Sequence, residues 1–370
     1  MSALFSPFDL GGLHLSNRIV IAPMCQYSAV DGCATDWHVM HLGTLAMSGA
    51  AMLVLEATAV SAAGRISPAD LGLYSDASEA ALAHTLVAVR RFATTKVAMQ
   101  LNHAGRKASS RAPWDGGRQI APDAPDGWQT QAPSAVPHAA GEHPPAALNR
   151  AGLEQVVADF AQAARRAARL GLDGIEIHAA HGYLLHQFLS PVANRREDEY
   201  GGSLENRLRF PLAVFDAVRA AFPADRPVWV RVSASDWVDG GWDLESTVAF
   251  ARVLKEHGCA AVHVSSGGVS TEQKIAVGPG YQVPFARRVK EAGLPVIAVG
   301  LITEPGQAEA IVRDGDADLV AIARAALYDP RWPWHAAAAL GAQVSAPRQF
   351  WRSQPRGLES LFADATHGQR

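Results

Sequence analysis

The chain has 370 residues, of which 48% are hydrophobic and 19% charged, a composition that predicts a soluble globular protein and excludes disordered and collagen-like chains. A net charge of −3, no extended basic run and no apolar run long enough to span a bilayer argue against nucleic-acid and membrane partners. The three cysteines, Cys25, Cys33 and Cys259, include no C-x-x-C pair, so neither a disulfide framework nor a bound metal is predicted.

The N-terminal segment, residues 1–17, predicts a small hairpin. Phe8, Leu10, Leu13 and Leu15 flank the pair Gly11-Gly12, and such a hairpin would plug the bottom of a barrel. The segment lacks the basic and then apolar pattern of a secretion signal, so we expect a cytoplasmic protein.

Short apolar runs alternate with longer amphipathic runs along the rest of the chain. The apolar runs predict strands at residues 18–22, 51–59, 96–102, 172–178, 228–233, 260–265, 295–300 and 318–323. The amphipathic runs predict helices at residues 78–93, 153–170, 204–221, 244–257, 284–292 and 304–314. Eight strands that alternate with helices predict a single α/β domain over residues 1–370, a (β/α)8 TIM barrel, with a doubly wound open sheet as the alternative.

Residues 103–150 form a long, proline-rich insertion after the third strand. Structureless loops of this length are uncommon inside compact domains, so the insertion is either an active-site lid or a flexible excursion. We favour a lid, because the insertion leaves the carboxyl end of a strand, where barrels of this kind carry their active sites.

Two histidines and a tyrosine mark the end of the fourth strand. His178, His181 and Tyr183 follow an apolar run, and Gly182 lets the chain turn away. Three interpretations compete: packed core residues, a metal site that includes Glu176, and hydrogen-bonding or acid–base chemistry. We favour the third, because no fourth metal ligand is evident in the sequence.

A dense run of charges at residues 194–209 leads into the third predicted helix, 204–221. It is either a solvated loop, or a segment whose arginines and carboxylates form ion pairs that hold it in place behind the active site. Ser203 and Asn206 place polar groups at a helix start.

Small residues follow the last three strands and predict a phosphate site. Ser265-Ser266-Gly267-Gly268 follows the sixth strand, Gly300 ends the seventh, and Ala323-Arg324 ends the eighth. Late strands of such barrels bind phosphate through backbone N–H groups, close-approach glycines and helix N-termini. Three similar strand ends therefore indicate a phosphorylated ligand.

Other strand ends carry groups that suit a heteroaromatic ring. The run Ala22-Pro23-Met24-Cys25-Gln26-Tyr27 follows the first strand, and Ala57, Gln100 and Arg231 lie near the ends of the second, third and fifth. Each could be an ordinary core or ion-pairing residue. Together they would place donors and acceptors around the barrel mouth.

Taken together, these motifs resemble those of the Old Yellow Enzyme family of FMN-dependent ene-reductases, in its thermophilic-like subgroup. The resemblance spans residues 17–352. Its most specific motifs are Asp198-x-Tyr200-Gly201-Gly202-Ser203-x-Glu205-Asn206-Arg207 and His178-x-x-His181-x-Tyr183. Ala22-Pro23-Met24-Cys25-x-Tyr27 marks the subgroup, because other members lack a cysteine there.

The resemblance implies FMN as the bound cofactor, with NADPH or NADH as the reductant. Arg231 would stabilise the N1–C2 edge of the reduced flavin, and Cys25 would tune its potential. The residues implied around the flavin ring are Pro23, Met24, Cys25, Ala57 and Gln100. Those implied near its phosphate are Ser266, Gly267, Gly300, Ala323 and Arg324.

The substrates implied are small activated alkenes. His178 and His181 would hydrogen-bond a carbonyl or nitro oxygen, Tyr183 would protonate the α-carbon, and Tyr27 would be a further substrate contact. Arg352, in the C-terminal segment 341–370, would reach the active site of a neighbouring subunit in a homodimer or homotetramer.

Two other functions remain open from the residues alone. One is a flavin-free barrel enzyme, such as a lyase or isomerase acting on a sugar phosphate. The other is a non-catalytic barrel that holds a phosphate ligand.

Overall fold

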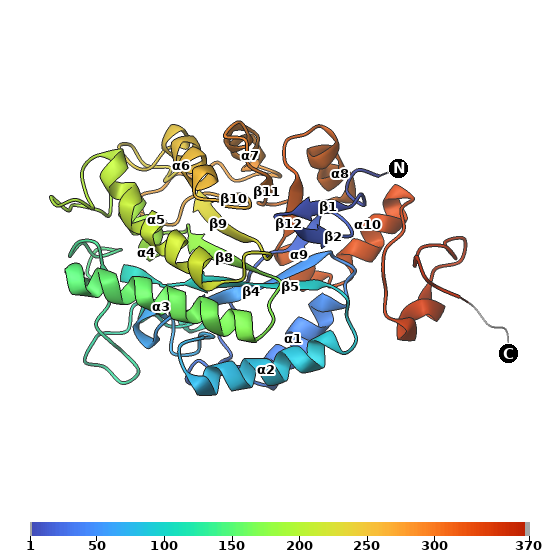
Figure 1. Cartoon of the computed structure of the whole chain (residues 1–370), viewed down its shortest axis with the longest axis horizontal. Coiled ribbons are helices and arrows are strands. Elements are labelled where there is room, and N and C mark those ends of the chain that lie inside the picture. The colour runs from blue at the N-terminus through green and yellow to red at the C-terminus, as the bar shows by residue number, and fades with distance from the viewer. Residues whose placement is uncertain (1, 367–370) are drawn as a thin grey trace.

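The computed structural model describes residues 2–366 and shows a closed barrel of eight parallel strands (Figure 1). β12 pairs with β3 through Val320 and Ile19, which closes the barrel and excludes the open sheet. The TIM-barrel prediction is therefore confirmed. In chain order the barrel strands are β3 (Ile19–Ile21), β4 (Met52–Ala59), β5 (Lys96–Asn102), β8 (Gly174–Ala179), β9 (Val228–Ser233), β10 (Val262–Ser265), β11 (Val296–Ala298) and β12 (Leu319–Ile322).

The barrel strands form because runs of branched apolar residues are buried on both faces, as parallel strands inside a ring of helices require. The bounds of β5 and β9 are as predicted. β11 is three residues shorter than the predicted strand 295–300, because the chain turns away at Gly300, where φ is +119°.

Helices cover the outside of the barrel (Figure 1). Those at the predicted positions are α2 (Asp76–Arg90), α3 (Arg150–Arg169), α5 (Leu204–Ala221), α6 (Leu244–Glu256), α7 (Val283–Lys290) and α8 (Pro305–Arg313). The N-terminus of α5 is as expected, since the Ser203 hydroxyl accepts a hydrogen bond from Asn206 N.

Four further helices were absent from the prediction: α1 (Asp36–Ala46), α4 (Leu184–Leu189), α9 (Arg324–Tyr328) and α10 (Trp332–Leu340). α4 and α9 are too short to show a helical period. In α1 the exposed Trp37 and Met40 interrupt the apolar stripe. α10 contains a run of alanines and lacks a distinct polar face.

The N-terminal hairpin is confirmed as β1 (Phe8–Leu10) and β2 (Leu13–Leu15), which pair antiparallel. Leu10 and Leu15 are fully buried. A Cβ at Gly11 would lie 2.9 Å from Ala260 Cβ, so the turn packs against residues that precede β10. The hairpin thus lies at the amino ends of the strands, the bottom of the barrel.

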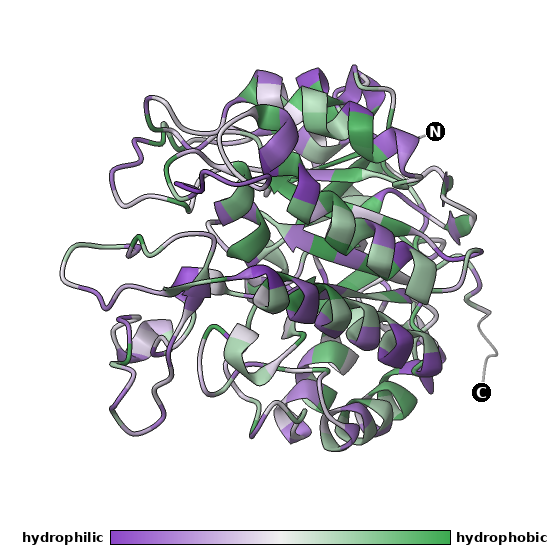
Figure 2. Cartoon of the chain, turned by 60° about the vertical axis from the view of Figure 1, so that its left-hand side comes forward, coloured by the Kyte–Doolittle hydropathy of each residue, from purple (hydrophilic) through white to green (hydrophobic). Residues whose placement is uncertain are grey.

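The insertion 103–150 contains short elements and docks on the barrel. These are the 3-10 turns η2 (Gly105–Lys107) and η3 (Pro113–Asp115) and the paired β6 (Gln131–Ala132) and β7 (Ala146–Ala147). Arg196 donates to the carbonyls of Pro133 and Leu148, so the charged segment is attached to the insertion, which supports the second interpretation of that segment. Figure 2 shows long loops projecting from one end of the barrel. The role of the insertion as a lid stays a prediction.

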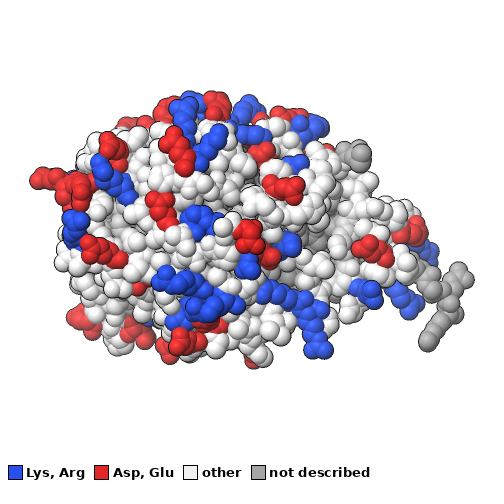
Figure 3. Space-filling view, viewed as in Figure 1, with Lys and Arg blue, Asp and Glu red and all other residues white. Residues whose placement is uncertain are grey.

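The C-terminal segment packs away from those loops, at the right of Figure 1. Its turn η4 (Arg348–Ser353) adjoins a small apolar cluster built on Trp334, Val344 and Phe362. On the face in Figure 3, acidic and basic side chains are interspersed. Within residues 2–366, no helix has the length and apolarity that a membrane span requires.

Candidate active site

The structure brings His178, His181 and Tyr183 together at the carboxyl end of β8. The His178 and His181 rings lie 5.0 Å apart between centroids, and the His178 and Tyr183 rings 4.9 Å apart, both edge to face. The His178 ring therefore packs against both other rings at the barrel mouth.

A tight turn produces this arrangement. His181 and Gly182 both have positive φ, +58° and +75°, and Tyr183 N donates to Ala180 O. A side chain at Gly182 would collide with the carbonyl of Gly268, so only glycine fits there. The buried Gln187 amide donates to the Gly182 carbonyl and holds the turn.

Hydrogen bonds define which nitrogen of His178 carries its proton. The backbone N–H of Ala180 donates to His178 Nδ1, so in the neutral ring the proton lies on Nε2. Burial, and next the charge of Arg231, lower the pKa of His178 well below its ordinary value. His178 is therefore a neutral hydrogen-bond donor at physiological pH.

The ring of His181 is fixed by Ser265. His181 Nε2 lies 2.7 Å from Ser265 Oγ. The hydroxyl's other neighbour, Gln282 Oε1, is 3.4 Å away and already accepts from Ser266 at 2.6 Å. The Ser265 hydroxyl is thus best placed to donate to Nε2, which puts the His181 proton on Nδ1. Burial and Arg231 also lower the pKa of His181, so this ring is neutral as well.

Tyr183 is a protonated phenol with a cation beside it. Burial, followed by Cys25 and Tyr27, raises the pKa of Tyr183 well above its ordinary value. Lys107 Nζ lies 5.1 Å from the ring centroid and donates to the carbonyls of His181 and Gly268. Lys107 therefore connects the tyrosine with the histidine turn.

A buried charge network lies below the trio. The register places His178 and His263 on either side of Arg231. Glu176 accepts from Gln100 Nε2 at 2.7 Å, Trp229 Nε1 at 2.6 Å and His263 Nδ1 at 2.7 Å. Burial opposes ionisation, but these donors and Arg231 outweigh it and lower the pKa of Glu176 to about 2. With its oxygens engaged in this way, Glu176 is an internal counter-ion, and the metal interpretation loses its first ligand.

Arg231 fits the edge of the flavin that the resemblance implies. Its side chain is buried, and within residues 2–366 no hydrogen bond engages its guanidinium. A buried guanidinium without a hydrogen-bonded partner is costly unless a ligand supplies an acceptor. The N1–C2 edge of a flavin presents such acceptors.

The residues expected around the flavin ring meet at the same edge. Ala57 and Gln100 are register partners on β4 and β5. Cys25, Ala57 and Tyr183 belong to one apolar cluster. Burial, followed by Asp70 and Glu56, raises the pKa of the Cys25 thiol well above its ordinary value, so the thiol stays protonated. Pro23 and Met24 immediately precede Cys25 in the loop after β3.

The residues expected near a phosphate lie at the ends of three adjacent strands, β10, β11 and β12. Gly267 and Gly300 have positive φ. A Cβ at Gly300 would collide with the Gln282 amide, so the backbone is bare there. Ala323 is the N-cap of α9, and Arg324 is exposed beside it. These strand ends suit a phosphate, while contact with one stays a prediction.

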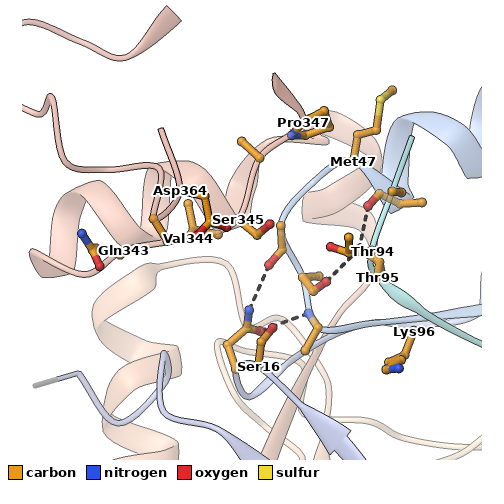
Figure 4. Close-up of a pocket in the computed structure, with 18 of the residues that line it drawn as sticks. Ser16, Met47, Thr94, Thr95, Lys96, Gln343, Val344, Ser345, Pro347 and Asp364 are labelled. Carbon is orange, nitrogen blue, oxygen red and sulfur yellow. Dashed lines mark hydrogen bonds between the residues drawn. The ribbon is translucent and has the colours of Figure 1, made fainter. Parts of the chain in front are cut away.

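Arg352 belongs to η4 in the C-terminal segment, at the right of Figure 1 and away from the loops at the other end of the barrel. A cavity of about 480 Å³ separates segment 343–347 from the residues that precede β4 and β5, at the bottom of the barrel (Figure 4). Thr95 and Asn17 hydrogen-bond carbonyls of that wall. Because Arg352 belongs to this C-terminal segment, an active site that it entered would be that of another subunit.

The sequence patterns missed several residues of the site. Lys107 lies in the insertion, and its place just beyond β5 is the only local signal of its role. Ser265 was noted only as part of the small-residue run predicted to bind phosphate, and His263 was hidden in a strand that reads as ordinary core. Their contacts with His181 and Glu176 join positions 84 and 87 residues apart.

Comparisons with known proteins agree on the class of this barrel. The profile of the NADH:flavin oxidoreductase / NADH oxidase family matches residues 3–343. The chain is 44% identical over 352 residues to the NADPH dehydrogenase of Geobacillus sp. (strain WCH70), which covers 94% of this chain and 98% of that one. An NADH:flavin oxidoreductase of Gibberella zeae is 42% identical over 376 residues, with 96% and 90% covered. The solved structure of morphinone reductase superposes with a TM-score of 0.76 at 31% identity, covering 93% and 91%.

Proposed function

Since this chain belongs to the NADH:flavin oxidoreductase / NADH oxidase family, the Old Yellow Enzyme group, we propose that it reduces the C=C bond of α,β-unsaturated carbonyl or nitro compounds. Its class is that of an NAD(P)H-dependent flavin oxidoreductase with FMN as cofactor. This class excludes the two other functions that the sequence alone left open, a flavin-free barrel enzyme and a non-catalytic barrel.

The observation that carries the proposal is the pair of neutral donors beside a protonated tyrosine. When bound, FMN supplies the hydride for the β-carbon of the alkene. His178 Nε2–H and His181 Nδ1–H would hold the conjugated oxygen and stabilise the negative charge that develops there. Because both rings are fixed by the backbone of Ala180 and by Ser265, this stabilisation needs no reorganisation.

Tyr183 would complete the reaction by protonating the α-carbon. Its phenol keeps its proton at neutral pH because burial raises its pKa. The neighbouring Lys107 cation would favour the phenolate that forms as the proton leaves. A positioned acid of this kind contributes about 10² to 10⁴-fold to the rate.

The proposed function is tested with the purified holoenzyme. We expect a yellow protein whose flavin absorbance is bleached by NADPH or NADH without oxygen and restored by 2-cyclohexenone. Mass spectrometry should show cyclohexanone, with one hydrogen from the coenzyme and one from solvent. Flavin that is bleached but never reoxidised by enones or nitroalkenes would contradict the proposal.

Replacing Ser265 with alanine tests how His181 is positioned. Without the hydroxyl, His181 loses its preference for the Nδ1 proton, and the donor to the substrate oxygen becomes intermittent. One hydrogen bond is worth about 1 kcal/mol, so we expect kcat/KM for 2-cyclohexenone to fall about fivefold. The ¹⁵N shifts of the His181 ring should move toward a mixture of tautomers, and Ser265→Thr should restore them. Unchanged shifts in Ser265→Ala would refute this role.

Arg352 is expected to act in a neighbouring subunit, which subunit mixing can test. Tyr183→Phe and Arg352→Ala chains are each expected to be weak in alkene reduction. Co-expressed, they should form mixed oligomers in which an intact Tyr183 site receives an intact Arg352, so activity returns. Arg356→Ala, in the same segment, is the matched control and should keep full activity. Mixed oligomers without recovered activity, or a monomer by analytical ultracentrifugation, would contradict the prediction.

A further inference from the structure

A second, smaller cavity of about 180 Å³ lies beside Tyr27, between the loop after β3 and the insertion. Tyr27 packs edge to face on Trp114 of η3, with ring centroids 5.5 Å apart, which docks the insertion over the cavity. At about 30 Å³ for each water molecule, the volume equals about six waters. A carboxylate or phosphate group fits in it, but a whole coenzyme does not.

The lining of this cavity is positively charged. Arg106, Lys107 and Arg111 line it with a single carboxylate, that of Glu142. Glu142 already accepts a hydrogen bond from Ala139 N. His138, also in the lining, is kept neutral by burial and by Lys107 and Arg106, which lower its pKa to about 4. The cavity therefore favours an anion.

The three cations differ in how many of their N–H groups are hydrogen-bonded to other residues. Arg106 is held by the carbonyls of Val136, Pro137 and Val269. Lys107 donates two of its three N–H groups to carbonyls, which leaves one for a ligand. Arg111 is exposed at the rim of the cavity, and no hydrogen bond or ion pair reaches its guanidinium from any other residue in 2–366, although its backbone N–H is fixed to Arg118 O. Lys107 and Arg111 are thus the available donors.

We propose that this cavity is an oxyanion-binding subsite, in which Arg111 and Lys107 hold a carboxylate or phosphate on the molecule that reacts at the flavin. The inference rests on the proposed function for the position of the reacting end. Lys107 lines the cavity and lies 5.1 Å from the Tyr183 ring, so the subsite adjoins the side chain that would protonate the substrate. The anion would belong either to an alkene that carries a carboxylate or to the 2′-phosphate that distinguishes NADPH from NADH.

Arg111→Gln in the holoenzyme tests the subsite, with Arg118→Gln as the control. Arg118, whose carbonyl accepts from Arg111 N, is exposed like Arg111 but does not line the cavity. The first arm compares 4-carboxycinnamaldehyde with 4-methylcinnamaldehyde, which differ in charge at the end remote from the reacting carbons. The second arm compares NADPH with NADH in anaerobic flavin bleaching.

If the anion belongs to the substrate, Arg111→Gln should lower kcat/KM for the carboxylate about three- to fivefold, mainly through KM, and leave the methyl compound unchanged. If it belongs to the coenzyme, the concentration of NADPH needed for half-maximal bleaching rate should rise by a similar factor, with NADH unaffected. Either result supports the subsite.

The proposal is overturned if Arg111→Gln changes neither the ratio of kcat/KM between the two aldehydes nor the ratio of bleaching rates between NADPH and NADH. It is also overturned if Arg118→Gln changes these two ratios equally. An enzyme that reduces neither aldehyde would contradict the proposed function. The bleaching arm would still decide on the subsite for a coenzyme phosphate, because it depends only on flavin reduction.

Discussion

Replacing Tyr183 with phenylalanine is expected to slow alkene reduction about 100-fold or more while leaving flavin reduction by the coenzyme nearly unchanged. The phenol is the only one of the three clustered side chains whose proton would leave in the reaction, and a positioned acid is worth about 10² to 10⁴-fold. Stopped-flow absorbance measures the two half-reactions separately, so the loss should appear only on reoxidation by 2-cyclohexenone.

Tyr200→Phe is the matched control, because Tyr200 is a partly buried tyrosine that packs on Phe210 outside the site. It should leave both half-reactions unchanged. Equal reoxidation rates in Tyr183→Phe and the unaltered enzyme would show that the α-carbon receives its proton elsewhere. A slower flavin reduction would place Tyr183 in coenzyme binding instead.

Replacing Glu176 with glutamine is expected to destabilise the holoenzyme by about 3–5 kcal/mol, the usual result of removing one partner of a buried charged pair, here that of Glu176 with His263. The carboxylate compensates the buried Arg231 and accepts from Gln100, Trp229 and His263. A neutral amide of the same shape leaves the guanidinium without its counter-ion. Urea unfolding followed by circular dichroism measures the loss, and flavin fluorescence in the filtrate of a centrifugal filter measures the FMN released.

The control is Glu154→Gln, since Glu154 pairs with Arg150 on the surface of α3, where its side chain is 70% exposed. Exposed pairs contribute about 0.2–1 kcal/mol, so this variant should be close to the unaltered enzyme. Similar stability of the Glu176 and Glu154 variants would mean that Arg231 is compensated by another group.

The same carboxylate predicts an acid limit of stability. Its pKa is lowered to about 2 in the folded state, against an ordinary value of about 4.3, so the unfolded chain binds this proton first as the pH falls. The contribution of Glu176, about 3 kcal/mol, is therefore complete above about pH 4.5 and lost between about pH 4 and 2. Glu176→Gln should flatten this part of the stability curve.

The strand ends show which site residues can be predicted from the sequence. His178, His181 and Tyr183 could be placed at a barrel mouth because an apolar run stops there and a glycine follows. That signal is local, and the structure brings the three rings together as expected. Lys107 gave no comparable signal, because its contacts run to the carbonyls of His181 and Gly268, 74 and 161 residues away.

The helices also divide into those that the sequence predicts and those that depend on tertiary packing. α5 and α6 carry apolar positions at helical spacing over several turns, together with Ser203 and Asp243 as caps, so their positions were predictable. α4 has six residues, all buried, and it forms because the turn at Gly182 and the Gln187 side chain direct it into the core. Such a helix depends on tertiary packing rather than on a period in the sequence.

The sequence by itself determined the alternation of eight strands with helices and which strand ends carry polar groups, since periodicity and breaker residues are properties of neighbouring positions. Closure of the sheet into a barrel required the pairing of β12 with β3. Only the tertiary structure decided which ring nitrogen of each histidine carries the proton, that Glu176 is a counter-ion, and that the segment with Arg352 lies away from the loops at the other end of the barrel. These depend on hydrogen-bond direction and on the register of strands distant in the chain. Neither is encoded in the spacing of residues along one segment.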